Sequence, residues 1–505
     1  MTAAPREPDQ RSDDERDRWV RPSNWSRPTP RRRYRLLVIG AGTAGLVSAA
    51  GAAGLGAKVA LVERHRMGGD CLNTGCVPSK ALIASARRAR SVRGAAEFGV
   101  TGGEGQVDFA AVMARMRRLR AAIAPHDSAE RFRGLGVDVF FGAARFVGPD
   151  CVRLDDGTEL RFRKAIIATG ASPFLPPIPG LEAVEPLTSE HLFDLNELPS
   201  RLLVIGGGPI GCEMAQTFAT FGAAVTLIEG GARILSRDDA DAAAMVAAAM
   251  TRDGVEIRLG SRVVAIERRG DERTAIVEKN GERFTIPFDR VLVATGRRPN
   301  VAGLGLEEAG VAFDPQRGIL VDDRLRSSNR RIFAAGDVAS PLQFTHAADF
   351  LARSAIRNAL FFGRASASGL IVPRCTYTSP EVASVGRSAD QAAADGIKVQ
   401  TFEIPFATVD RAQLDGETEG FVRVVCRAGS DRLLGATVVG ENAGDLIAPL
   451  VLALQQRIGL GRIGATIHSY PTRAEAIRRL GDAYSRTRLT PMVKRLFRFW
   501  LGGND

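Results

Sequence analysis

A glycine-rich turn occurs twice, each time between a short apolar segment and a run of small residues, and it constrains the fold more than any other feature. The motif glycines are Gly40, Gly42 and Gly45 in the first copy, and Gly206, Gly208 and Gly211 in the second. In each copy a second apolar segment ends in an acid, Glu63 or Glu229, which lies 23 residues after the first glycine. The repeated order predicts two strand–turn–helix–strand units.

Each unit has the local chemistry of a dinucleotide site. The first glycine allows a tight turn, the second lets the backbone approach a pyrophosphate, and the third lets helix and strand pack closely. The helix amino terminus offers free N–H groups to phosphates, and the acid accepts a hydrogen bond from a ribose hydroxyl. One copy alone is also typical of an ordinary strand-to-helix turn. Two copies in the same context predict two dinucleotides, a tightly held flavin at one site and a mobile nicotinamide dinucleotide at the other.

The acid of the second copy bears on which nicotinamide dinucleotide binds. A carboxylate at Glu229 repels a 2′-phosphate, so the sequence favours NADH over NADPH. Arg233 lies close by in the sequence and is the opposing feature, because an arginine can accommodate that phosphate.

Composition and charge narrow the class of protein. The 505 residues are 45% hydrophobic and 25% charged, as in soluble globular proteins, and the length predicts about three domains. Residues 1–33 lack the apolar core of a signal peptide, and no stretch reaches the apolar length of a membrane span. We therefore expect a cytoplasmic protein.

The net charge of +11 lies mostly in the two ends of the chain. Residues 1–33 carry +3 and residues 486–505 carry +4, which leaves +4 for everything between them. The sequence thus predicts no nucleic-acid-binding face. Residues 1–33 mix charges with proline and serine without an apolar period, so we expect a disordered tail.

Two of the six cysteines, Cys71 and Cys76, lie five residues apart at a predicted helix start directly after the first unit. The pair is compatible with two unrelated small residues, with a metal site, or with a redox disulfide. The spacing is poor for zinc, and no metal site is predicted. A helix start lowers the pKa of a thiol and so favours a redox pair. We expect the other cysteines to be buried filler; they are Cys151, Cys212, Cys375 and Cys426.

The segment GGDCLNTGCVPSK, with GAGTAG upstream, resembles the signature of the pyridine nucleotide-disulfide oxidoreductases of the lipoamide dehydrogenase, glutathione reductase and mercuric reductase type. The resemblance runs from about Tyr34 to Glu475. It implies an α/β fold with two Rossmann-like dinucleotide-binding domains, for FAD and NAD(P), and a C-terminal α+β dimerisation domain, hence a homodimer. The implied parts are 34–180 and 300–370 for FAD, 181–299 for NAD(P) and 371–485 for the interface. Outside the resemblance, residues 486–505 are predicted to form a basic amphipathic tail.

The resemblance also implies roles for individual residues. Cys76 is the thiol nearest the flavin, Cys71 is the interchange thiol that meets substrate, and Lys80 lies near the flavin and pairs with Glu213. Further residues are implied to bind FAD, namely Thr169, Gly170, Gly336, Asp337 and His346, and Gly296 is implied to bind NAD(P). Electrons then pass from NAD(P)H through FAD to the Cys71–Cys76 disulfide and on to an acceptor.

The chain departs from this pattern where the lipoamide and glutathione branches carry a catalytic histidine. Tyr470 stands at that position, Glu475 is in place, and His468 lies two residues earlier as a possible replacement base. An ordinary tyrosine is a poor proton shuttle at pH 7. Mercuric reductases resemble the chain in lacking the histidine, but they carry a vicinal cysteine pair near the C-terminus and often an N-terminal metal-binding domain with a C-x-x-C pair. This chain has no cysteine after Cys426 and no C-x-x-C pair.

The acceptor predicted first is therefore a metal ion such as Hg(II), as in a mercuric reductase. A dihydrolipoyl dehydrogenase-like disulfide reductase and a dithiol redox sensor or flavin-binding partner protein are the alternatives. In the tail, Val493, Leu496, Phe497 and Trp500 follow helical spacing beside basic residues. We expect such a helix to pack on its own protein or partner subunit rather than on a membrane.

Overall fold

The computed structural model describes residues 8–101, 103–361 and 363–501. Contacts divide the chain into two compact units, each of which is considered by itself. Unit 1 comprises the described residues up to 206 together with 217–228 and 261–370. Unit 2 comprises 207–216, 229–260 and the described residues from 371 onward.

A seven-stranded sheet forms the centre of unit 1. Its order is β3 (Val137–Phe141), β2 (Val59–Glu63), β1 (Tyr34–Ile39), β6 (Glu159–Ile167), β5 (Cys151–Leu154) and β4 (Ala144–Gly148), and β18 (Ile332–Ala334) also pairs with β6. The pairs among β3, β2, β1, β6 and β18 are parallel. Leu36 and Val38 face one core and Leu37 and Ile39 face another, so both faces of β1 are covered and its sequence is a continuous apolar run.

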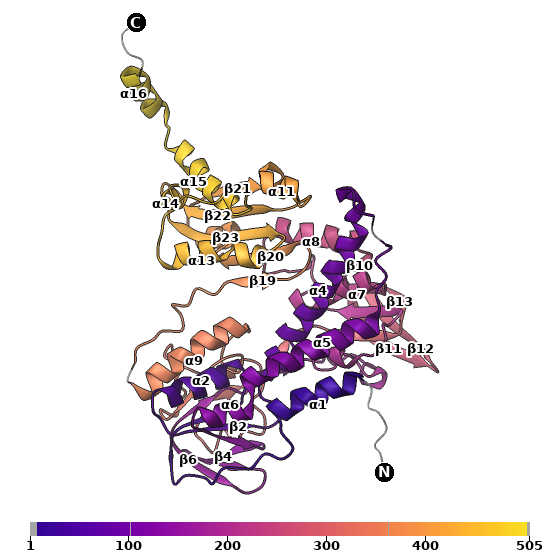
Figure 1. Ribbon diagram of the computed structural model, residues 1–505, viewed down its shortest axis with the longest axis vertical. Helices are drawn as coiled ribbons and strands as arrows, with labels where there is room; N and C mark the ends of the chain where they lie inside the picture. Colours follow the sequence, from indigo (N-terminus) through magenta and orange to yellow (C-terminus); the bar gives the residue numbers. More distant parts are fainter. Residues whose placement is uncertain (1–7, 102, 362, 502–505) are drawn as a thin grey trace. The chain divides into compact units, whose positions relative to one another are not determined.

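Helices α2 (Thr43–Gly54) and α9 (Thr345–Leu360) cover one face of this sheet and lie side by side in Figure 1. The alanines of α2 pack with Leu351 and Ile356 of α9 in the same core as Leu36. Small side chains on α2 allow the helix to lie close to its neighbours.

The second glycine motif follows β8 (Arg201–Ile205) and begins α7 (Pro209–Phe221). Within unit 1, β8 pairs in parallel with β9 (Ala224–Glu229) and with β14 (Arg290–Val293). An antiparallel sheet lies beside them in the chain, made of β11 (Arg262–Arg269), β12 (Glu272–Lys279) and β13 (Glu282–Phe288). The chain crosses between the two strand systems where β7 (Ala171–Pro173) pairs with β15 (Arg297–Pro299). The prediction of two Rossmann-like units is confirmed.

Unit 2 contains a five-stranded antiparallel sheet. Its order is β19 (Arg374–Thr376), β20 (Glu381–Gly386), β23 (Leu433–Gly440), β22 (Phe421–Arg427) and β21 (Val399–Pro405). Helices α13 (Ala448–Gln455) and α15 (Glu475–Thr487) pack on it through Leu450, Ile477 and Leu480, which are buried with Val422 and Val424. Together these elements form the α+β C-terminal domain that the sequence predicts.

The prediction that residues 1–33 are disordered is wrong for residues 8–33, whereas residues 1–7 lie outside the described residues. Residues Pro8–Val20 form α1, which lies along α5 (Phe109–Ile123) in Figure 1. Asp13 binds the buried Arg120 at 2.6 Å, and Val20 is fully buried. Arg120 needs a counter-ion in the core, and α1 supplies it. No local apolar period signals such a contact.

The predicted C-terminal helix is present as α16 (Pro491–Leu501). None of its residues is buried, and Trp500 is 76% exposed. Across the described ranges, no helix combines the length and apolar character needed to cross a membrane.

Candidate redox site and dinucleotide-binding motifs

The first glycine motif makes the close contacts that its glycines allow. Gly40 has φ +98°, and a Cβ there would overlap the carbonyl oxygen of Ala168 at the end of β6. A Cβ on Gly45 would overlap the carbonyl oxygen of Gly40, so the third glycine lets α2 approach β1. Gly42, the residue before α2, meets only the backbone of Gly69 at 3.6 Å from such a Cβ.

Glu63 ties the end of β2 to this turn. One carboxylate oxygen accepts a hydrogen bond from the Ala41 N–H at 2.7 Å, and the other accepts from the His65 N–H at 2.7 Å. The side chain is buried, and burial raises the pKa of the Glu63 carboxyl while the two backbone N–H groups oppose the shift. The acid therefore shapes the turn, and its role toward a ribose stays a prediction.

Three parallel strands deliver predicted site residues to one edge of the sheet, because their carboxyl ends lie together. Gly40 follows β1, Thr169 and Gly170 follow β6, and Gly336 and Asp337 follow β18.

Asp337 is half-buried at this edge. Burial raises the pKa of Asp337 to about 6, while the positive charge of Arg297 opposes the shift. Arg297 itself donates to Asp70 and to the carbonyl of Ala171. Thr169 donates its hydroxyl to the carbonyl of Asn300 at 2.8 Å, which joins the two crossing segments.

Residues 68–76, the dithiol segment, dock directly onto the first glycine motif. The Gly68 N–H donates to the carbonyl of Ala41 at 2.8 Å. Gly69 has φ +55°, and a Cβ there would stand 2.6 Å from the Cα of Gly42. Our sequence analysis gave these two glycines no role. The sequence signal that could have found them is two consecutive glycines just before Cys71, because residues without side chains let this segment lie against the backbone of Gly42.

Cys71 and Cys76 are free thiols that hydrogen-bond to each other. Cys71 lies in α3 (Gly69–Asn73) and is half-buried, whereas Cys76 is the first residue of α4 (Cys76–Arg93) and is exposed. The hydrogen bond to Cys76, together with burial, raises the pKa of Cys71. The amino terminus of α4 favours negative charge at Cys76, so Cys76 loses its proton before Cys71 does. The hydroxyl of Thr345 lies 3.4 Å from the Cys76 sulfur.

The other four cysteines are predicted to be buried. Cys151, Cys212 and Cys426 are buried, as predicted, and Cys375 is half-buried. His346, which the sequence analysis placed at the flavin, stacks on Phe344 with ring centres 5.4 Å apart.

The predicted Lys80–Glu213 pair stays a prediction, because Lys80 lies in unit 1 and Glu213 in unit 2. Within unit 2, Glu213 is 5% exposed and accepts a hydrogen bond from the Tyr377 N–H at 2.9 Å.

The second glycine motif repeats the geometry of the first. Gly206 has φ +110°, and a Cβ there would stand 2.6 Å from the Ala294 carbonyl oxygen. Glu229 accepts from the N–H groups of Gly207 at 2.7 Å and Gly231 at 2.6 Å. No described atom lies within 4 Å of a Cβ built on Gly208.

The other two predicted NAD(P) residues are Gly211, which is the third glycine of the motif, and Gly296. Gly211 lies in α7, and Gly296 has φ +126° directly before β15. Arg233 turns its guanidinium to the carbonyl oxygens of Ser236, at 2.9 Å, and Asp238, at 3.2 Å.

Tyr470 lies in unit 2, and its hydroxyl donates to Asp410 at 2.9 Å. This hydrogen bond and the charge of Asp410 raise the pKa of Tyr470 above its ordinary value. The ring is 69% exposed. His468 is half-buried and contacts the carbonyl oxygen of Thr466 at 2.9 Å, and Glu475 begins α15. Sequence reasoning missed Asp410, which lies 60 residues away from Tyr470.

Comparison with known families decides the assignment. The pattern of the pyridine nucleotide-disulphide oxidoreductases matches residues 34–351, and that of their dimerisation domain matches residues 372–480. The chain belongs to this family. The oxidoreductase is thus a flavoprotein enzyme, and members of its family use FAD and NAD(P)H.

Relatives of this oxidoreductase carry two different names. A mercuric reductase of Bacillus cereus is 35% identical over 445 residues, 88% of this chain and 70% of its own. A dihydrolipoyl dehydrogenase of Geobacillus stearothermophilus is 37% identical over 448 residues, 87% of this chain and 93% of its own. The family resemblance read from the sequence is confirmed.

Solved structures with similar folds include a flavoprotein disulfide reductase. A Cu(II) complex of the HOCl-induced flavoprotein disulfide reductase RclA from Escherichia coli has a TM-score of 0.80 and 28% identity, covering 90% of this chain and 100% of its own. LpdA from Mycobacterium tuberculosis has a TM-score of 0.81 and 27% identity, covering 90% of this chain and 99% of its own.

Proposed function

We propose that this oxidoreductase uses NADH to reduce a thiol-binding metal ion, with Hg(II) as the first candidate, through Cys71 and Cys76. The proposal rests on the surroundings of the thiol pair and of Tyr470, the groups that would exchange protons with a substrate. The thiols hydrogen-bond to each other with Cys76 exposed, while the pKa of Tyr470 is raised by Asp410. A metal ion displaces thiol protons by itself, whereas dithiol exchange needs a base near neutral pKa.

Two relatives support a metal ion as the acceptor. One is named a mercuric reductase, and one solved structure of similar fold is a Cu(II) complex of a flavoprotein disulfide reductase. Both are properties of those proteins, and they make the metal ion the first acceptor to test here.

The first glycine motif fits the pyrophosphate of FAD, because Gly42 directly precedes α2 and puts no side chain between the backbone N–H groups at the helix start and a phosphate. Glu63 would bind the ribose, and Asp337, Thr169, Gly170, Gly336 and His346 would line the remainder. FAD, when bound, carries an electron pair from the nicotinamide to the disulfide. Lys80, neutralised by Glu213, would face the flavin.

The second motif would hold the nicotinamide dinucleotide through Gly206, Gly208, Gly211 and Gly296. Glu229 ends β9, and its carboxylate would repel a 2′-phosphate on the ribose that it is proposed to bind. The Arg233 guanidinium is already bonded to two backbone carbonyls, which leaves it poorly placed to compensate. Both features support NADH as the electron donor.

The thiol chemistry balances in two steps. Two electrons and two protons open the Cys71–Cys76 disulfide to two thiols. Hg(II) then binds both sulfurs and displaces the two protons. The sulfurs return to the disulfide as the ion takes up two electrons and leaves as Hg(0).

Tyr470 would act from the partner subunit as a neutral hydrogen-bond donor rather than as a base. The match to the dimerisation domain supports a homodimer. Ile467, three residues before Tyr470, is 95% exposed in the single chain, as expected of a residue that a second copy covers.

A dihydrolipoyl dehydrogenase-like activity is the second candidate, because a relative of that name shares 37% identity with the chain. Tyr470 counts against it. Its raised pKa keeps the hydroxyl protonated near pH 7, so it does not take a proton from the interchange thiol.

The test measures NADH oxidation by the flavin-loaded enzyme after addition of Hg(II) with excess small-molecule thiol. We expect steady turnover that Cys71→Ala abolishes and Cys151→Ala leaves intact, because Cys151 is a buried thiol outside the pair. Cu(II) and lipoamide are run beside it. Turnover no faster than that of Cys71→Ala with every metal ion would refute the proposal, and fast lipoamide turnover would establish the second candidate.

A further inference from the structure

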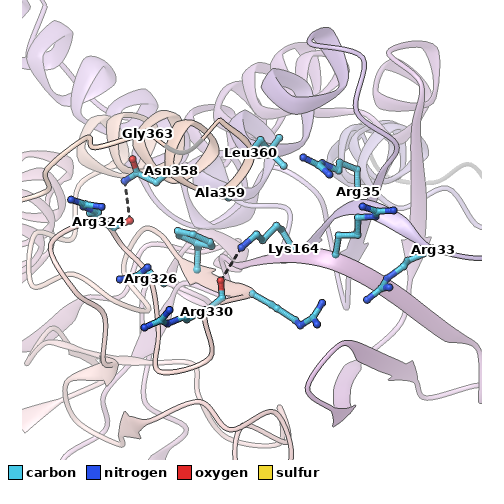
Figure 2. A pocket seen from close by; sticks show the side chains of 13 residues that line it. Arg33, Arg35, Lys164, Arg324, Arg326, Arg330, Asn358, Ala359, Leu360 and Gly363 are labelled. Carbon is cyan, nitrogen blue, oxygen red and sulfur yellow. Dashed lines mark hydrogen bonds between the residues drawn. The ribbon is translucent and has the colours of Figure 1, made fainter.

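A pocket lined by basic side chains lies at the end of the unit 1 sheet away from the glycine motif (Figure 2). Arg35 is the second residue of β1, Lys164 belongs to β6, and Arg331 immediately precedes β18. Register brings them together, since Leu36 pairs with Lys164 and Ile332 with Ala165. Gly40, at the other end of β1, is five residues from Arg35, or about 17 Å along a strand. The pocket is therefore distinct from the dinucleotide motifs.

Five more basic residues complete what we call the arginine pocket. They are Arg33, Arg163, Arg324, Arg326 and Arg330. In Figure 2 the labelled cations lie on both sides of Lys164, whose ammonium donates to the Arg330 carbonyl at 2.9 Å. The side-chain amide of Asn358 donates a hydrogen bond to the carbonyl of Arg324 at 2.9 Å. The basic side chains thus come from separate strands and loops that the fold holds in place.

Little of this charge is neutralised within the chain. Arg326 pairs with Asp322 at 2.9 Å, and Arg33 pairs with Asp150 at 2.7 Å. For the other six basic residues, the described part of the chain shows no ion pair, and no acid lines the pocket. Burial lowers the pKa of Lys164, and the positive charges of its neighbours lower it further. These neighbours are Arg331, Arg326 and Arg35.

The shape and chemistry of the pocket define its ligand. Its volume is about 530 Å³, within the range of small-molecule sites. Guanidinium groups bind phosphate oxygens through paired hydrogen bonds, and several in one concave site suit several linked phosphates. Phe333, Ala359 and Leu360 are buried lining residues that leave apolar surface beside the charges. A nucleic-acid face is instead an extended basic stripe.

We propose that the arginine pocket binds a small oligophosphate, either inorganic or the phosphate chain of a nucleotide. The basic residues contact the phosphates, and the apolar lining residues face whatever the chain carries.

The experiment uses flavin-loaded enzyme with saturating NAD⁺ present, so that the dinucleotide motifs are occupied. Binding of tripolyphosphate, ATP and adenosine is measured by calorimetry. The test variant is R35E/R331E. The control is R317E/R432E, which makes the same charge change at two exposed arginines outside the pocket.

We expect R35E/R331E to raise the Kd for tripolyphosphate about 30-fold or more, and the control to change it less than about threefold. If ATP binds with the same dependence and adenosine does not bind, a nucleotide phosphate chain is accepted too. If only tripolyphosphate binds, the ligand of the pocket is an inorganic oligophosphate.

Other results would overturn the proposal. These are no saturable binding of any phosphate, equal weakening in both double variants, or binding confined to long nucleic acids. Flavin content and the melting temperature report folding. If R35E/R331E does not retain flavin, R35Q/R331Q replaces it with the same expected direction.

Discussion

The two glycine motifs share nearly the same backbone geometry but differ in what surrounds them. In both, the first glycine lies against a carbonyl oxygen of a neighbouring strand end, Ala168 or Ala294. In both, the acid accepts from two backbone N–H groups at 2.6–2.7 Å. The sequence repeat is thus a structural repeat.

The difference lies at the second glycine. Gly42 is covered by Gly69 of the dithiol segment, whereas the Cβ position of Gly208 is open. Glu63 is 8% exposed, and Glu229 is only half-buried. A covered motif suits a cofactor that stays bound beside the dithiol, and an open motif suits one that exchanges. The same glycine motif can therefore suit a permanently bound cofactor or an exchanging one, depending on which segment packs against it.

Replacing Gly69 with alanine should break the covered motif and produce the largest effect. The new Cβ would stand 2.6 Å from the Cα of Gly42, so two backbones must separate. We expect the free energy of unfolding to fall by about 2–4 kcal/mol, with loss of bound flavin. Gly99→Ala is the control, because Gly99 also has positive φ, +71°, but open space. Equal losses in urea unfolding would show that backbone strain, and not the contact, is responsible.

The pH dependence of stability should single out Asp337, which follows β18 at the sheet edge where the covered motif also lies. Its folded-state pKa of about 6 lies above the ordinary 3.8, so its contribution to stability is complete below pH 3.8 and lost as pH rises through 6. In flavin-depleted protein, the free energy of unfolding of Asp337→Asn should rise relative to that of the wild type by up to about 3 kcal/mol as the pH increases from 4 to 7. The exposed Asp271→Asn should show no such gain. A pH-independent difference in urea unfolding for Asp337→Asn would contradict the assignment.

Gly208→Ala should affect the open motif without harming the fold. A methyl group there meets no protein atom but blocks the approach of a pyrophosphate to the backbone. We expect the KM for NADH to rise about tenfold, with flavin content and melting temperature unchanged. Gly134→Ala, at another open glycine, should leave KM unchanged. An unaltered KM in Gly208→Ala would mean that the dinucleotide does not pass this turn.

Glu229→Ala should give the smallest effect, a change of selectivity. Removing the carboxylate ends its repulsion of a 2′-phosphate, so the ratio of kcat/KM for NADH to that for NADPH should fall about fivefold. The exposed Glu282→Ala should preserve the ratio. If the wild type already prefers NADPH, the proposed role of Glu229 is wrong.

Much of the fold could be predicted from the sequence because its signals are local. The glycine spacing, the flanking apolar segments and the acids at 63 and 229 lie within single units. The positions of Cys71 and Cys76 after the first unit follow from the same short-range order. The roles of the site residues toward the cofactors stay predictions.

What the sequence could not supply are contacts between distant segments. Asp13 reaches Arg120, and Asp410 reaches Tyr470, across 107 and 60 residues. The first contact orders a helix where the composition predicted disorder, and the second changes the chemistry of a tyrosine. Neither leaves a periodic pattern in the chain.

The sequence by itself therefore determined the family, the two dinucleotide units and the identity of the thiol pair, because each depends on residues close together in the chain. The tertiary structure alone decided which motif is covered, which of the two thiols is exposed, and where basic residues converge away from the dinucleotide motifs. The physical reason is that burial and charge at a site are summed over every segment packed there, and strand register sets which segments those are.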